Sequence, residues 1–219
     1  MNSHRSSQPN VRLHSPAAER NQAQILAELR RVLPRKGLAL EIASGTGQHA
    51  AHFAVGLHGW HWQPTDAEPQ ALASIDAWCG GLTNVRPALH LDVLAAARDA
   101  SQGNMPAPFD AIYCANMLHI SPWDTCAALM RLAAQHLTAS GVLLLYGPYL
   151  EDTVPTAPSN LAFDADLRAR DAAWGLRRLA DVLQQAQAVG LQIRERVPMP
   201  ANNLLLVLER AAPSVEKAT

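Results

Sequence analysis

Three acidic side chains, Glu41, Asp66 and Asp92, stand where chemistry is expected, because each lies at or near the end of an apolar run. A turn of small residues, Ala43-Ser44-Gly45-Thr46-Gly47, follows the first of these runs. Glycine lets the backbone approach a ligand closely and adopt dihedral angles that other residues avoid. An acidic residue followed by a turn of small residues and the start of a helix is typical of a site for a nucleotide-like cofactor. A tight strand–helix connection would use the same residues.

The glycine spacing indicates which cofactor fits. The dinucleotide-binding fingerprint is GxGxxG, whereas this turn has the spacing GxGxG with Ala43 in the place of the first glycine. A carboxylate at Glu41 suits a cationic ligand better than a pyrophosphate. S-adenosylmethionine (SAM) carries a sulfonium and an ammonium group and no phosphate, so the segment favours SAM over NAD. An NAD-dependent oxidoreductase is the competing interpretation.

The other two acids fit the same ligand. Asp66 could accept hydrogen bonds from both ribose hydroxyls. Asp92 could accept from the adenine amino group while Val93 packs on the ring. Each acid could instead cap the helix that follows it, but three acids at the ends of three consecutive strands are harder to attribute to capping alone.

Strand and helix patterns alternate along the chain, and each acid falls between a strand and a helix. Ser15-Pro16 reads as an N-cap and a first helical residue. Apolar runs predict strands at 38–42, 60–65, 85–91, 109–114 and 141–146, with helices at 46–57, 69–79, 93–100 and 121–137, the last opened by a capping box at Ser121. Two further helices, 160–171 and 175–189, precede an antiparallel strand pair at 191–197 and 203–210. Five βα repeats predict an α/β, Rossmann-like fold: a seven-stranded, mostly parallel sheet with an antiparallel terminal hairpin and helices on both faces.

The predicted domain organisation is simple. Residues 1–14 form a flexible N-terminal arm, 15–212 a single domain and 213–219 a flexible tail. Within the domain, the Pro-rich segment 147–175 is an insertion that we expect to act as a lid.

Composition and net charge indicate which classes of binding partner to expect. The formal net charge is -1, and hydrophobic residues make up 48% of the chain. These values favour a globular protein with no field for nucleic acid or an anionic membrane. The three widely spaced cysteines and the absence of an apolar signal segment favour a cytoplasmic protein with reduced thiols. Histidine pairs at 49/52 and 58/61 lack a carboxylate or cysteine to complete a metal site, so we expect none.

Several motifs together resemble those of class I SAM-dependent methyltransferases: Glu41 through Gly47, Asp66, Asp92 and Phe109-Asp110-Ala111-Ile112. More narrowly, the chain is similar to the methyltransferase-like 26 family, long described as a domain of unknown function. The stretches that carry this similarity include Arg20-Asn21, Gln63-Pro64-Thr65-Asp66, Asn116 through Trp123, Tyr146-Gly147-Pro148-Tyr149, Ser159-Asn160, Phe163-Asp164, Trp174-Gly175 and Pro200 through Asn203. The similarity covers nearly the whole chain beyond the N-terminal arm.

The resemblance implies a set of cofactor residues and a set of substrate residues. The cofactor set is Glu41, Ala43, Ser44, Gly45, Gly47, Asp66, Asp92, Val93 and Asn116. The substrate pocket would be formed by Arg20, Asn21, His49, Tyr149, Asp164, Arg168 and Trp174.

Two residues are candidates for a catalytic role. His119 could act as a general base or an orienting donor, because imidazole titrates near neutrality, or it could be a hydrogen-bonded structural histidine. Tyr146 could reach the substrate with its hydroxyl, or pack in the core. Arg20 could pair with the SAM carboxylate or with an anionic substrate, and Asp164 and Arg168 could simply form an ion pair on a helix surface.

The expected activity is transfer of a methyl group from SAM to a small-molecule acceptor. The alternative is a SAM-binding protein without turnover, acting as a sensor or partner subunit. Because methyl transfer mainly requires a nucleophile held in line with an already activated methyl group, no obvious catalytic signature is expected.

Overall fold

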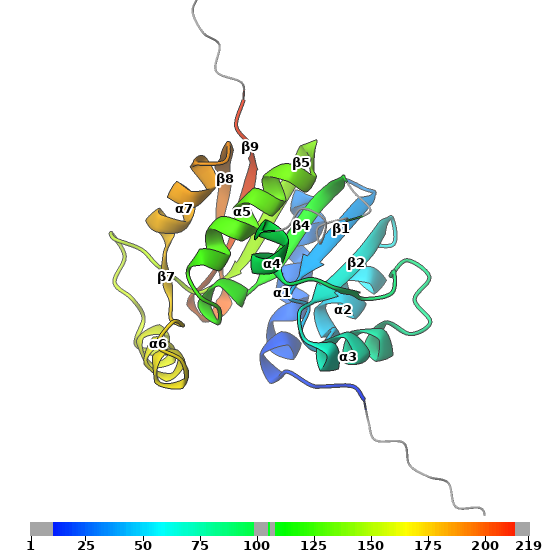
Figure 1. The fold of residues 1–219 in the computed structure, drawn as a ribbon, viewed down its shortest axis with the longest axis horizontal. Coiled ribbons are helices and arrows are strands. Elements are labelled where there is room, and N and C mark those ends of the chain that lie inside the picture. The colour runs from blue at the N-terminus through cyan, green and yellow to red at the C-terminus, as the bar shows by residue number, and fades with distance from the viewer. Residues whose placement is uncertain (1–10, 99–104, 106–107, 213–219) are drawn as a thin grey trace, which may run out of the picture.

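A seven-stranded sheet organises the computed structural model, which describes residues 11–98, 105 and 108–212 (Figure 1). In spatial order the strands are β3 (Leu89–His90), β2 (Trp60–Asp66), β1 (Gly37–Ile42), β4 (Phe109–Ala115), β5 (Leu137–Gly147), β9 (Asn203–Arg210) and β8 (Leu191–Met199). The strands from β3 to β5 pair in parallel, and β9 runs antiparallel to both β5 and β8. The predicted fold, including the terminal hairpin, is confirmed. The strand order reverses between β1 and β4, where doubly wound sheets place their ligands.

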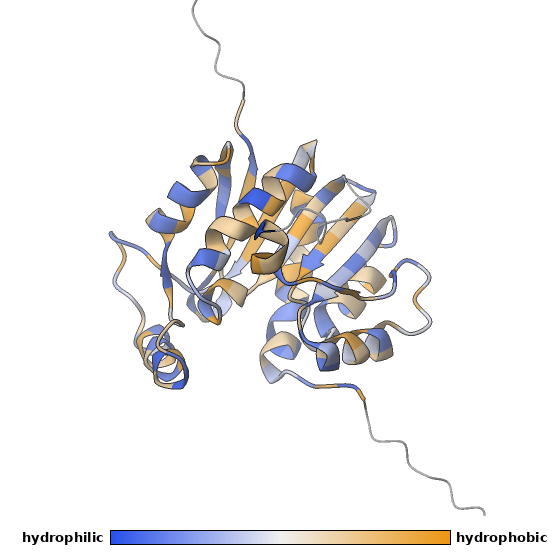
Figure 2. Ribbon diagram, in the orientation of Figure 1, coloured by the Kyte–Doolittle hydropathy of each residue, from blue (hydrophilic) through white to orange (hydrophobic). Residues whose placement is uncertain are grey.

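Helices cover both faces of this sheet, because side chains of a strand point alternately to opposite sides. In β4, Ala111 and Tyr113 join the cluster under three helices: α1 (Pro16–Val32), α2 (Gln48–Gly56) and α3 (Pro69–Cys79). Ile112 and Cys114 join the cluster under α4 (Val93–Arg98), α5 (Asp124–His136) and α7 (Leu179–Gln187). Figure 2 shows much of the strongly hydrophobic colour on the central strands of the sheet, with helices of mixed hydropathy on both sides.

The first helix begins as its sequence predicts. The Ser15 hydroxyl accepts a hydrogen bond from the Ala18 N–H, and Pro16 occupies the first helical position. Four apolar residues of α1 are buried on one face, namely Ile25, Leu26, Leu29 and Val32.

Three local predictions are wrong. The third strand is two residues long, with an isolated bridge between Trp62 and Val85, because Pro87 cannot donate to a ladder. The predicted capping box does not form: the Ser121 hydroxyl donates to the Met117 carbonyl, and α5 starts without a side-chain cap. Residues 175–178 are not helical, because β7 (Arg177–Arg178) pairs with β6 (Tyr149–Leu150) instead.

The insertion after β5 contains β6, α6 (Pro158–Arg170) and β7. In Figure 1, α6 lies at the lower left, apart from the sheet. Only two of its residues, Asn160 and Leu167, are buried. The insertion is tied to the turn after β4 by Arg177, whose guanidinium donates to the carbonyls of Leu118 and Ser121.

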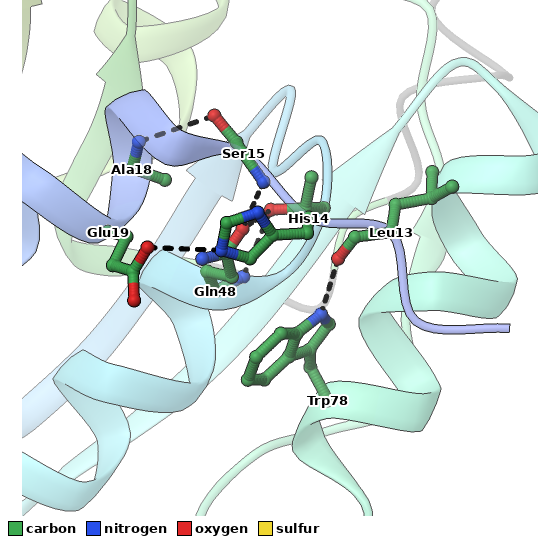
Figure 3. A network of polar contacts seen from close by, with 8 residues as sticks. Leu13, His14, Ser15, Ala18, Glu19, Gln48 and Trp78 are labelled. Carbon is green, nitrogen blue, oxygen red and sulfur yellow. Dashed lines mark hydrogen bonds and ion pairs between the residues drawn. The ribbon is translucent and has the colours of Figure 1, made fainter. Parts of the chain in front are cut away.

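The last residues of the predicted N-terminal arm are bound to α3 (Figure 3). The Leu13 N–H donates to the Ser74 hydroxyl at 2.8 Å. The Trp78 indole N–H donates to the Leu13 carbonyl at 2.8 Å, as Figure 3 shows. Leu13 is therefore hydrogen-bonded to two residues of α3. The rest of the predicted arm, 1–10, and the predicted tail, 213–219, fall outside the described residues.

No helix in the described part of the chain combines the length and the apolar character that a membrane span requires.

Candidate functional site

The glycine-rich turn between β1 and α2 has a left-handed backbone at three places. The φ angles are 52° at Ala43, 57° at Gly45 and 88° at Gly47. A Cβ on Gly47 would lie 2.6 Å from the Cα of Ile75, so glycine here permits α2 to pack against α3. A Cβ on Gly45 would meet no described atom within 4 Å, so the backbone at Gly45 borders open space that a ligand can enter.

Asp66, at the end of β2, holds this turn in place. Its carboxylate accepts the Gly45 N–H at 2.8 Å and the Glu68 N–H at 3.0 Å. The side chain is mostly buried, with 8% relative exposure. An ionised carboxylate has about four lone-pair sites, so Asp66 can hold the turn and still accept hydrogen bonds from a ligand.

The N-terminal segment is tied to the same turn. The Ser15 N–H donates to the Gln48 side-chain carbonyl at 2.6 Å, and the Thr46 hydroxyl donates to the same oxygen at 3.0 Å (Figure 3). In addition, the Ser74 hydroxyl, which accepts the Leu13 N–H, donates a hydrogen bond to the Thr46 carbonyl at 2.7 Å. The start of α1 and the turn are therefore one hydrogen-bonded unit.

Glu41 has a different environment from the one its charge suggests. It is 2% exposed, and it accepts a hydrogen bond from the indole N–H of Trp62 on the neighbouring strand. Burial raises the pKa of Glu41 to about 8, although the bond from Trp62 opposes this effect. With this pKa the neutral acid predominates at pH 7, which differs from the ionised carboxylate that the sequence suggests.

Asp92 and Val93 serve the start of α4. The Asp92 carboxylate accepts the N–H groups of Leu94 and Ala95 at 2.8 and 3.1 Å, which is an N-cap. The Val93 side chain is buried in the core. The capping interpretation of Asp92 thus describes this structure, and little of Val93 is left to contact an adenine ring.

A cavity of about 540 Å³ opens beside Asn116, at the carboxyl ends of β4 and β5. Residues from α1, α6 and the turn between β8 and β9 complete its walls. Its lining residues are Ala17, Arg20, Asn21, Gln24, Asn116, Tyr146, Pro148, Ser159, Asn160, Phe163, Pro200, Ala201 and Asn203.

The cavity brings together four of the predicted site residues: Arg20, Asn21, Asn116 and Tyr146. The sequence contains no signal for Gln24, whereas Asn203 stands in the motif Pro200 through Asn203. The signal for Ser159, Asn160 and Phe163 was present, since Ser159-Asn160 and Phe163-Asp164 are among the motifs singled out in the sequence.

A hydrogen-bonded chain runs from the core to this cavity. His49 Nε2 lies 2.7 Å from Asn21 Oδ1, and His49 Nδ1 lies 3.3 Å from the Tyr113 hydroxyl. Burial lowers the pKa of His49 to about 4, so the ring is neutral. Because an amide oxygen only accepts, Nε2 carries the hydrogen and Tyr113 donates to Nδ1. His49 therefore lies behind Asn21 and orients its amide, rather than lining the cavity.

Tyr146 is the cavity end of the chain. Burial raises its pKa, and a weaker side-chain hydrogen bond with Asn21 opposes that shift. Asn21 and Tyr146 both line the cavity, so the phenol hydroxyl lies beside the Asn21 amide at the cavity wall.

His119 is not at the cavity surface. Its side chain is 0% exposed, and neither ring nitrogen makes a regular hydrogen bond within the described structure. Burial lowers the pKa of His119 to about 3, and the nearby backbone of Gly175 offsets only part of this effect. The ring packs edge-on against Tyr149 at 5.0 Å, behind Gly147 of β5. A general-base role is not supported by this position.

The predicted lid residues stabilise the insertion itself. Asp164 pairs with Arg168 at 2.9 Å and accepts the Leu176 N–H at 2.6 Å. Trp174 lies under the Arg170 guanidinium, 5.1 Å from its ring centroid. None of the predicted residues Tyr149, Asp164, Arg168 and Trp174 lines the cavity. Across the described residues, no three His, Cys, Asp or Glu side chains gather as metal ligands would.

Comparison with solved structures identifies the architecture. The mitomycin 7-O-methyltransferase MmcR superposes with a TM-score of 0.74 at 17% identity, covering 89% of this chain and 54% of that one. Human N-acetylserotonin methyltransferase in complex with SAM gives a TM-score of 0.73 at 13% identity, covering 90% and 53%. CalO1, a methyltransferase of calicheamicin biosynthesis in its SAH-bound form, gives 0.70 at 16% identity, covering 89% and 55%.

At such identities the likeness concerns the fold, which is the Rossmann-like fold of these methyltransferases. This chain spans slightly more than half the length of the proteins it matches. Residues 12–210 match the family described as "Protein of unknown function (DUF938)". With nearly the whole described chain inside that match, the protein belongs to the DUF938 family.

Proposed function

We propose that this protein transfers a methyl group from SAM to a small-molecule acceptor. The observation that carries the proposal is the arrangement of two features at one edge of the sheet: a cavity at the carboxyl ends of β4 and β5, and the glycine-rich turn with Asp66 at the carboxyl ends of β1 and β2. There the turn at Gly45 and the carboxylate of Asp66 offer backbone and acceptor groups to a nucleoside. The solved relatives include proteins bound to SAM or its product S-adenosylhomocysteine (SAH). The stretches similar to the methyltransferase-like 26 family support the same assignment.

The chemistry demands little beyond positioning. A lone pair of the acceptor attacks the methyl carbon, the carbon–sulfur bond breaks, and its electron pair stays on sulfur to give SAH. A proton carried by the acceptor atom leaves to solvent or to a nearby base. In-line placement of the two reactants supplies most of the catalysis. The neutral, buried His119 is not required for such a step.

In this proposal the cofactor lies across the switch point of the sheet. Asp66 receives the ribose hydroxyls, the turn from Ala43 to Gly47 faces the amino-acid portion, and Asn116 lies between cofactor and acceptor. The acceptor occupies the 540 Å³ cavity. Glu41 supports the turn from behind as a neutral acid, and an approaching sulfonium or ammonium group would favour its ionised form.

Calorimetry with SAM, SAH and NAD tests the cofactor assignment. We expect SAM and SAH to bind and NAD not to bind. The reverse pattern would overturn the proposal in favour of an oxidoreductase.

Incubation with methyl-labelled SAM and a small-molecule cell extract tests turnover. Formation of SAH together with a labelled small product is expected. Tight SAH binding without any product in repeated extracts would favour the alternative, a SAM-binding protein without turnover.

A further inference from the structure

The walls of the cavity carry charge of one sign. Arg20, on the first turns of α1, is the one charged residue among those that line it. Within the described residues its guanidinium makes no hydrogen bond or ion pair. None of the described residues that line the cavity carries a carboxylate. An unpaired guanidinium without a competing acid is suited to bind a carboxylate or another anionic oxygen group.

A second donor reaches the same cavity. Tyr146 lines it beside Asn21, whose side-chain oxygen lies 2.7 Å from His49 Nε2. The phenol hydroxyl of Tyr146 can donate a hydrogen bond to a ligand in this cavity. Arg20 and Tyr146 lie on α1 and β5, so the donors come from two independent elements that face one space.

The opposite wall offers acceptors. The Asn160 amide N–H group donates to the Asn202 carbonyl at 3.0 Å, and that of Asn203 donates to the Pro200 carbonyl at 3.0 Å. Their amide oxygens are thereby left for a hydroxyl or amine hydrogen of a ligand. Apolar surface between the two walls comes from Pro148 and Phe163.

From this arrangement we infer that the acceptor is a small molecule with an anionic oxygen group, which Arg20 and the Tyr146 hydroxyl bind. This inference rests on the proposed function, because it names the substrate class of the same site. The methyl donor SAM also has a carboxylate that Arg20 could bind. A test must therefore distinguish an anionic group on the acceptor from the carboxylate of SAM.

The experiment uses three probes that share one ring and differ in charge: benzoate, benzamide and benzylamine. Their affinities are measured by calorimetry or ligand-observed NMR on protein saturated with SAH. Benzoate is expected to bind about tenfold more tightly than benzamide, with benzylamine weakest. Arg20→Gln should reduce benzoate binding to the level of benzamide, and Arg20→Lys should restore part of it. Tyr146→Phe should weaken benzoate severalfold more than benzamide.

Arg194→Gln is the matched control, because it makes the same change of charge on an exposed strand residue outside the cavity. It should leave all three affinities unchanged. Circular dichroism and melting curves establish that each variant is folded.

Three results would overturn the inference. The first is that benzoate binds no more tightly than the neutral or cationic probe, or shows no binding at about 10 mM, a concentration suited to weak fragment-sized ligands. The second is that Arg20→Gln leaves benzoate affinity unchanged, and the third is that Arg20→Gln reduces SAH affinity as much as benzoate affinity. The last result would assign Arg20 to the donor carboxylate. Failure of SAH to bind at all would count against the proposed function instead, and the probes would then be compared on the unliganded protein.

Discussion

The carboxylate of Asp66 and the backbone N–H of Gly45 form a 2.8 Å hydrogen bond that joins the end of β2 to the glycine-rich turn after β1. The two residues are 21 positions apart in sequence. Their bond means that a single side chain shapes the turn and remains available to a ligand. A change at Asp66 therefore acts on the cofactor site in two ways.

Asp66→Ala removes both functions, and we expect SAH affinity to fall by about 1–3 kcal/mol, the cost of losing hydrogen bonds to a charged group. Asp66→Asn keeps one acceptor oxygen and should lose less. Calorimetry with SAH measures both, with Asp181→Asn at an exposed position of α7 as the control. Equal affinity of the wild type and a folded Asp66→Ala variant would disprove the ribose assignment.

The two glycines of the turn should respond differently to alanine. Gly47→Ala combines a left-handed φ with a contact of 2.6 Å to Ile75 Cα, so it should lower the free energy of unfolding by about 2–5 kcal/mol. Gly45→Ala carries only the dihedral cost of about 1–2 kcal/mol. Its methyl group projects into open space and should reduce SAH affinity instead. Urea unfolding and calorimetry on both variants separate stability from binding; the reverse order of stability losses would contradict the packing argument.

Glu41→Gln tests the buried neutral acid. The folded-state pKa of about 8 lies above the ordinary pKa of a glutamate side chain, 4.5. Between these values the folded protein holds a proton that the unfolded chain has released, so this group makes stability fall as pH rises from about 4.5 to 8. Glutamine cannot ionise and preserves an acceptor for Trp62.

The variant should therefore gain stability relative to the wild type as pH rises through this window. Urea unfolding of both proteins at pH 5, 6.5 and 8 gives the difference directly. A difference that stays constant with pH would show that Glu41 is ionised in the folded protein.

His119→Leu tests whether the buried imidazole destabilises the folded protein or takes part in catalysis. Both ring nitrogens lack a regular hydrogen bond, and leucine of similar volume avoids a desolvation cost of about 1–3 kcal/mol. We expect equal or higher stability at pH 7 and undiminished methyl transfer.

The same variant should also resist acid better. The pKa of His119 is lowered from 6.5 to about 3, so its contribution to stability is present above the unfolded value and is lost as pH falls through that interval. Unfolding at pH 4 and 7 checks this difference. A large loss of turnover in stable His119→Leu protein would restore the histidine to the mechanism.

Much of the scaffold follows from local pattern. Ser15 and Pro16 determine where α1 begins. The runs of apolar residues that become β1, β4 and β9 already indicate that these strands are buried. The sequence predicts a longer third strand than the structure has, because the apolar run at 85–91 contains Pro87, which cannot donate to a ladder. The start of α5 was misassigned because Ser121 found a closer acceptor at Met117.

The candidate site was predictable where it depends on residue type at a strand end, as at Gly45, Asp66 and Asn116. It was not predictable where it depends on which distant side chains meet. Nothing near Glu41 in sequence indicates that Trp62 lies against it. Nothing near His119 indicates that the insertion buries it completely.

By itself, the sequence determined the order of helices and strands, the glycine turn and the acids at its edge of the sheet, because hydrophobic periodicity and turn chemistry act over a few neighbouring residues. The tertiary structure decided which groups are charged and which face the cavity. Protonation and accessibility depend on the surroundings that distant segments create: burial makes Glu41 and His119 neutral, while α1 and β5 bring Arg20 and Tyr146 to a common space.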